Sequence, residues 1–250
     1  QMCIRDSAMS DEQDIRKMGG IWKDIKVTYV LMLIGSIAIA GIPPFAGFFS
    51  KDIILESAYA AGTNVGYFAY WMGIFAAFCT AFYSWRLLIL TFNGTSRASE
   101  EVRSHIHESP LVMLIPLVVL AVGAVFAGLV GGGALGMVDA EGAFWKGALL
   151  VEQEVNPLEA AHNVALWVKL TPLFVAISGI ILAYVMYLWF PGIPKQLART
   201  FWFVHRFLLN KWYVDELYEA LFVRPTKLLG TTLWKFLSLI HISEPTRQDR

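Results

Sequence analysis

The feature that most constrains the fold is the segment of residues 27–50, which contains no charged side chain. At about 1.5 Å per helical residue it reaches about 36 Å, which is enough to cross a hydrocarbon core of roughly 30 Å. Its middle contains Gly41, Pro43, Pro44 and Gly47. Two adjacent prolines remove two backbone donors and clash with the preceding turn, so we expect the helix to break over residues 41–47. The segment therefore predicts a membrane span that is interrupted inside the bilayer.

Composition extends this prediction to the whole chain. Hydrophobic residues make up 56% and charged residues 16%, and the mean hydropathy is +0.54. These values are typical of an all-α polytopic membrane protein. The formal net charge of zero gives no indication of a nucleic-acid partner. Apolar runs between loop signals predict four membrane spans, at about residues 27–56, 66–92, 111–130 and 170–190, the third ending at the glycines of residues 131–133.

The remaining segments are more polar. Residues 11–26 read as a charged connector, followed by the transmembrane region 27–194. In residues 195–240, polar positions recur mostly at spacings of four and seven, which predicts amphipathic helices at a membrane interface, with Pro225 interrupting them before a further helix. The terminal stretches 1–10 and 241–250 are polar and lack periodicity, so we interpret them as tails foreign to the fold, with native disordered tails as the alternative.

The distribution of positive charge predicts the orientation. Lys and Arg side chains concentrate in three places: before the first span, after the second and after the fourth. Two crossings separate each of these from the next, so all three lie on one side of the membrane. The other side receives an uncharged turn and an acidic stretch at residues 134–168. The positive-inside rule therefore places the basic loops in the cytoplasm or mitochondrial matrix.

Lys51 and its acidic neighbours are the candidate proton-transfer residues. On a helix, Lys51 has Gly47 and Leu55 at i−4 and i+4, so no local carboxylate pairs with it. A desolvated lysine without a fixed partner can gain and lose its proton near neutral pH, as a proton relay must. Asp52 points about 100° away around the axis and lies at i−4 from Glu56, which suggests an acidic exit step. The alternative is that Lys51 lies near the outer interface and extends harmlessly into the headgroups.

Other chemistry finds little support in the chain. Cys3 and Cys79 predict neither a disulfide nor a thiolate metal site, and His162 and His205 look isolated. No phosphate loop, dinucleotide fingerprint, nucleophile elbow or haem motif is present in the sequence. We therefore expect no metal, no cofactor and no redox chemistry in this chain.

Four segments carry a family resemblance. Residues 11–20 (DEQDIRKMGG), 41–52 (GIPPFAGFFSKD), 107–128 (HESPLVMLIPLVVLAVGAVFAG) and 210–225 (NKWYVDELYEALFVRP) are similar to successive parts of the antiporter-like subunits of respiratory complex I. They look like successive segments from the C-terminal half of the largest such subunit, chain L of NADH-quinone oxidoreductase, called subunit 5 in mitochondria. The block at 41–52 also fits the related cation/proton antiporter subunits.

The resemblance implies a function and a setting. It implies that this chain is the C-terminal part of a longer subunit, that Lys51 matches the family's terminal proton-channel lysine, and that Asp52 is the acid beside it. It further implies partners among the other membrane-arm subunits and the lipid bilayer, no small-molecule substrate besides protons and water, and a multi-pass location in the bacterial or mitochondrial inner membrane. The helix near residue 226 would open a lateral helix along that arm.

Two other functions remain open at this point. One is a subunit of a multisubunit sodium/proton antiporter, which an ion gradient drives and which has no redox partner. The other is a structural membrane scaffold in which Lys51 only reaches the interface.

Overall fold

A computed structural model describes residues 14–137, 144–146, 148 and 157–242. These residues form helices and connecting turns, and contain no strand, so the expectation of an all-α polytopic membrane protein is confirmed. Contacts divide the chain into two compact units, Gln1–Pro191 and Gly192–Arg250, which we describe separately. The interpretation of residues 1–10 as a foreign tail lies outside the described residues, as does that of residues 243–250, and the acidic stretch at 134–168 lies partly outside them.

The first unit contains the predicted spans. Three of its helical segments are long and apolar enough to cross a membrane by themselves: Asn64–Phe92, Leu111–Ala134 and Leu166–Trp189. The first predicted span is instead two helices of 15 residues on either side of a break, each about 22 Å long and too short to cross alone. The helices in order are η1 (Ile21–Lys23), α2 (Lys26–Ala40), α3 (Ala46–Ala60), α4 (Asn64–Phe92), α5 (Glu100–Ser104), α6 (Leu111–Gly128), η2 (Leu129–Ala134), α7 (Pro157–His162), α8 (Leu166–Tyr184) and η3 (Val185–Trp189).

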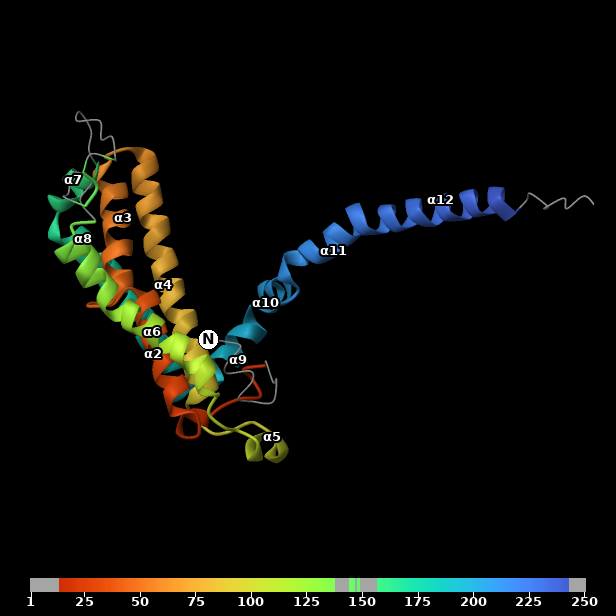
Figure 1. Cartoon of the computed structure of the whole chain (residues 1–250), viewed down its shortest axis with the longest axis horizontal. Coiled ribbons are helices and arrows are strands. Elements are labelled where there is room, and N and C mark those ends of the chain that lie inside the picture. The colour runs from red at the N-terminus through yellow and green to blue at the C-terminus, as the bar shows by residue number, and fades with distance from the viewer. Residues whose placement is uncertain (1–13, 138–143, 147, 149–156, 243–250) are drawn as a thin grey trace, which may run out of the picture. The chain divides into compact units, whose positions relative to one another are not determined.

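Helix α4 is the centre of this unit. It packs along α8 and contacts both α2 and α3, and Figure 1 shows α3 beyond the break from α2 with α4 running back alongside. A Cβ on Gly179 of α8 would lie 2.8 Å from the carbonyl oxygen of Phe78 and 3.3 Å from the Cβ of Ala81, so the two backbones approach closely there. Such small-residue contacts let helices pack closely in lipid, where burial of apolar surface supplies little drive for association.

The N-terminus of α2 is capped from far along the chain. The Glu108 carboxylate accepts hydrogen bonds from the backbone N–H of Val27, at 3.0 Å, and of Thr28, at 3.1 Å. It also accepts one from the Thr28 hydroxyl, whose side chain is buried. These bonds satisfy two of the orphan donors of a helix start and place a negative charge at the positive end of the helix dipole. The segment before α6 therefore fixes the start of the broken span.

The third predicted span ends later in the structure than the sequence indicates, and the fourth begins earlier. The glycines of residues 131–133 do not stop α6; instead the helix widens into the π turn η2, which continues to Ala134. A π turn has an extra residue in each turn, so the helix widens there without ending. The fourth helix begins at Leu166 and includes Lys169, which the prediction had left in the preceding loop.

The second unit is a series of helices that corrects one prediction. Pro225 does not interrupt the helix, because α11, η5 and α12 follow one another without a break. The N–H of Arg224 bonds to the carbonyl of Glu219, one residue further back than in an α-helix, and this wider turn leaves room for the proline ring. The interruption lies earlier, at residues 211–213, where φ is 50°, 63° and 55°. The elements are α9 (Gly192–Thr200), α10 (Trp202–Leu209), η4 (Lys211–Tyr213), α11 (Val214–Tyr218), η5 (Glu219–Val223) and α12 (Arg224–Ile242).

Candidate functional site

The break between α2 and α3 has a defined geometry. Gly41 follows the last residue of α2 with φ at 76°, in the left-handed region that glycine adopts without strain. Its N–H donates to the carbonyl of Ala38 at 3.2 Å, and the N–H of Ile42 donates to that of Ile37 at 3.4 Å. This pair of bonds is the Schellman arrangement that closes helix C-termini. The predicted break at residues 41–47 is therefore present, and α3 begins at Ala46.

Lys51 reaches back to this break. Its ammonium Nζ donates a hydrogen bond to the carbonyl oxygen of Ala40 at 3.1 Å, and its side chain is half-buried. The Ala40 carbonyl is one of the C-terminal carbonyls that lose their partners when α2 ends, and it lies at the negative end of the α2 dipole. The sequence predicts no fixed partner for Lys51 on its own helix. The structure gives it a neutral one, eleven residues earlier in the chain.

Lys51 also lines a cleft between the broken span and α4. The cleft has a volume of about 370 Å³. Three polar side chains face it, those of Ser50, Lys51 and Thr80, among apolar and small residues. The space is large enough for several water molecules, each of which occupies about 30 Å³ in the liquid. The full lining comprises Ile39, Ser50, Lys51, Ile54, Leu55, Gly73, Ala76, Ala77 and Thr80.

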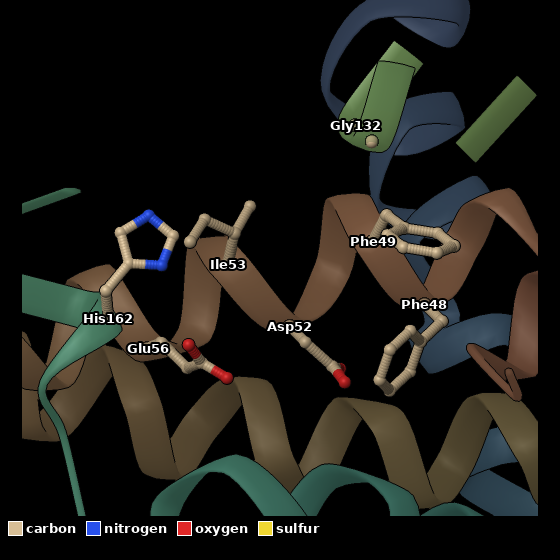
Figure 2. Close-up of a pocket in the computed structure, with 8 residues that line it drawn as sticks. Phe48, Phe49, Asp52, Ile53, Glu56, Gly132 and His162 are labelled. Atoms are coloured by element: carbon tan, nitrogen blue, oxygen red, sulfur yellow. The ribbon is translucent and has the colours of Figure 1, made fainter. Parts of the chain in front are cut away.

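Asp52 and Glu56 lie in a second pocket, away from that cleft. This pocket has a volume of about 310 Å³ and is also lined by Phe48, Phe49 and Ile53, by two glycines of η2 and by His162 of α7. Figure 2 shows the two carboxyl groups leaving α3 on the same side, one turn apart. Asp52 is 7% exposed. Neither carboxyl group makes a hydrogen bond or ion pair with any other described residue, so both have acceptor capacity available for water.

Two residues of this site were missed by the sequence analysis. The interpretation of His162 as isolated is wrong, because its imidazole lines the pocket of Asp52 and Glu56. Lys169, on the first turn of α8, donates from Nζ to the backbone carbonyl of His162 at 2.8 Å, and both residues interact electrostatically with Glu56. The two come from α7 and α8, more than 100 positions along the chain from Glu56, so no local spacing could have linked them to it.

The described residues offer little for other chemistry. They contain no group of three or more His, Cys, Asp or Glu side chains arranged to hold a metal ion. Cys79 is a free thiol, and Cys3 lies outside the described part of the chain. Among the described residues, the stretch of α3 from Lys51 to Glu56 brings a lysine and two carboxylic acids to two water-sized pockets, of about 370 and 310 Å³.

Comparison with known proteins places this geometry in context. The family described as "NADH:quinone oxidoreductase/Mrp antiporter, TM" matches residues 2–80, which include the break and the candidate residues Lys51, Asp52 and Glu56 of α3. The chain is similar to NADH-quinone oxidoreductase subunit L of Rhodobacter capsulatus, with 36% identity over 293 residues, covering 91% of this chain and 41% of that protein. It is also similar to NADH-ubiquinone oxidoreductase chain 5 of Phytophthora infestans, with 37% identity over 213 residues, covering 84% of this chain and 32% of that protein. The same-named protein of Marchantia polymorpha is 37% identical over 221 residues, covering 87% and 33%. The chain thus spans between 32% and 41% of the length of these relatives.

Proposed function

Because this chain belongs to the family of antiporter-like membrane subunits of NADH-quinone oxidoreductase, we propose that it is part of a proton-translocating subunit of that complex. The relatives are named as subunits of an enzyme complex, and the apolar helices support a membrane location. In this proposal the complex lies in a bacterial or mitochondrial inner membrane, which the chain crosses several times. Its partners are other membrane-arm subunits and lipid, and it moves only protons and water. Redox centres and cofactors belong to other subunits.

One observation carries the proposal: a lysine ammonium held beside interrupted helical backbone. Lys51 is half-buried on α3 and bonded to the Ala40 carbonyl, a dipolar partner without a full charge. An ionisable side chain at a helix break within a membrane points to ion or proton transfer, because such groups are costly to keep there and the open backbone needs water or protein partners.

The two faces of α3 suggest the route. Lys51 faces the cleft shared with α4, while the next residue, Asp52, faces the pocket that also holds Glu56. A proton arriving at Lys51 from water in the cleft has only a short distance to travel to the acidic pocket. Quinone reduction elsewhere in the complex would drive this transfer by rearranging charges and water around Lys51. Glu56, one turn nearer the outer end of α3, is then an exit step.

The test is a Lys51→Ala substitution in the intact subunit. We expect proton pumping to fall greatly while the membrane arm still assembles, because the variant lacks the protonatable group but keeps the break. Lys23→Ala is the control, since Lys23 lies in the connector before α2 and we expect it to leave pumping unchanged. Wild-type pumping by the Lys51→Ala variant would refute the proposal.

A sodium/proton antiporter subunit is the second candidate, because the matching family also includes Mrp antiporters. Reading the neighbouring genes separates the two: quinone-reductase subunits favour the first, and small antiporter subunits favour the second. A structural scaffold is the third candidate. It would require Lys51 to lie in the headgroup region, bathed in bulk solvent, which a measurement of its depth in the full assembly would decide.

A further inference from the structure

His162 lines the pocket that also holds Asp52 and Glu56. It is the last residue of α7, a short helix that packs against α3. The predicted orientation puts this end of the bundle opposite the cytoplasm or matrix, because the basic loops lie at the other end. We propose that His162 is a proton-transfer residue that carries protons from Glu56 to the outer aqueous phase. This inference rests on the proposed function.

The pocket gives the two side chains a shared space. Glu56 comes from α3 and His162 from α7, and both line the same volume of about 310 Å³ (Figure 2). That volume is large enough for several water molecules. A hydrogen bond through a bridging water is nearly as favourable in enthalpy as a direct hydrogen bond. Gly132 and Gly133 of η2 form part of the wall and add no side chain to fill it. In Figure 2 the imidazole lies beside Ile53 and the Glu56 carboxyl group points away from it, so a proton passing between them would move through water in the pocket.

Lys169 places a positive charge beside the route from Glu56 to His162. Asp52 and Glu56 of α3 line the same pocket as His162, and Lys169 of α8 lies beside its backbone carbonyl. The Lys169 ammonium is anchored on the His162 carbonyl at 2.8 Å, and it attracts the Glu56 carboxylate left behind by a departing proton.

The transfer needs no other reactant. The Glu56 carboxyl O–H gives its proton through water to an imidazole nitrogen of His162, leaving a carboxylate and an imidazolium. The imidazolium N–H then gives the proton to outer water and returns to neutral imidazole. Histidine suits this role because it is the side chain that ordinarily changes charge between pH 5 and 8.

The test uses the intact subunit assembled in its complex and reconstituted in liposomes. Removal of a proton-transfer group slows its step by a factor of about 100 or more, so we expect His162→Ala to reduce the rate of proton release by at least about tenfold. Imidazole added to the outer medium should restore release, because it can enter the vacated space and carry the proton. The matched control is His205→Ala on α10, whose side chain is exposed, and it should change nothing.

Each outcome has one meaning. Unchanged release in His162→Ala, or a loss that imidazole does not restore, overturns the assignment. If His162→Ala fails to assemble, His162→Gln keeps the size and hydrogen bonding of the residue, and wild-type release in that variant overturns the assignment equally. Lys51→Ala is measured in parallel. Loss of pumping in Lys51→Ala with normal release in His162→Ala leaves the proposed function intact and removes only the role of His162.

Discussion

The cap that Glu108 places on α2 yields a quantitative prediction. The broken span can hold the Ala40 carbonyl beside Lys51 only if α2 itself is fixed in place. Glu108 contributes by accepting two backbone hydrogen bonds, at 3.0 and 3.1 Å from the N–H groups of Val27 and Thr28, and one from the Thr28 hydroxyl. Glu108→Ala removes all three at once and leaves the Thr28 side chain, which is 1% exposed, without this acceptor.

The magnitude follows from these bonds. Loss of an N-terminal cap costs about 0.5–2 kcal/mol, and a hydrogen bond to a charged group contributes about 1.5–3 kcal/mol. The bonds share one carboxylate and are not additive, so we expect about 2 kcal/mol for opening the first turn of α2. That free energy corresponds to a factor of roughly 30 in the opening equilibrium.

Hydrogen exchange of the intact, assembled subunit measures this opening. The amides of Val27 and Thr28 should exchange about 30-fold faster in Glu108→Ala than in the wild type, in proportion to the opening equilibrium. Glu108→Gln, which keeps one carbonyl acceptor, should show a smaller increase. Glu100→Ala, an exposed residue at the start of α5, is the control. Unchanged exchange at both amides in Glu108→Ala would show that the carboxylate does not hold this helix end.

The remaining predictions concern the break and the connector. A Cβ on Gly47 would overlap the carbonyl oxygen of Ala38, so Gly47→Ala should push α3 away from α2, lower the free energy of unfolding by about 1–3 kcal/mol and reduce proton pumping. A Cβ on Gly123 would meet open space, so Gly123→Ala is the control and should change neither quantity. Equal behaviour of the two variants would refute the close packing. The hydrogen bonds from Arg16 lower the pKa of Asp14 from 3.8 to about 2. The stabilisation from this pair is therefore fully present above pH 3.8 and is lost as the pH falls through about 2, where the Asp14 carboxylate becomes protonated. In Arg16→Ala, the pKa of Asp14 measured by NMR titration should rise back toward 3.8. An unchanged pKa would contradict the pairing.

Local chemistry made the broken span predictable. Proline and glycine act on their own turn of helix, so the break after Ala40 followed from the residue types alone. The apolar lengths of the other spans were equally visible, because a helix in lipid needs about 20 apolar residues wherever its neighbours lie. The prediction failed at Pro225, since the π turn that accommodates the ring depends on backbone geometry rather than on residue type.

The sequence by itself determined the membrane class, the position of the break and the choice of Lys51, Asp52 and Glu56 as candidates. Only the tertiary structure decided which groups those side chains meet. The Ala40 carbonyl reaches Lys51 because the chain turns at the break, and His162 and Lys169 reach Glu56 because α7 and α8 pack near α3. Periodicity reports which face of a helix is apolar, but the rotation and neighbours of each helix are set by close contacts between spans, and these are not encoded at any fixed spacing along the chain.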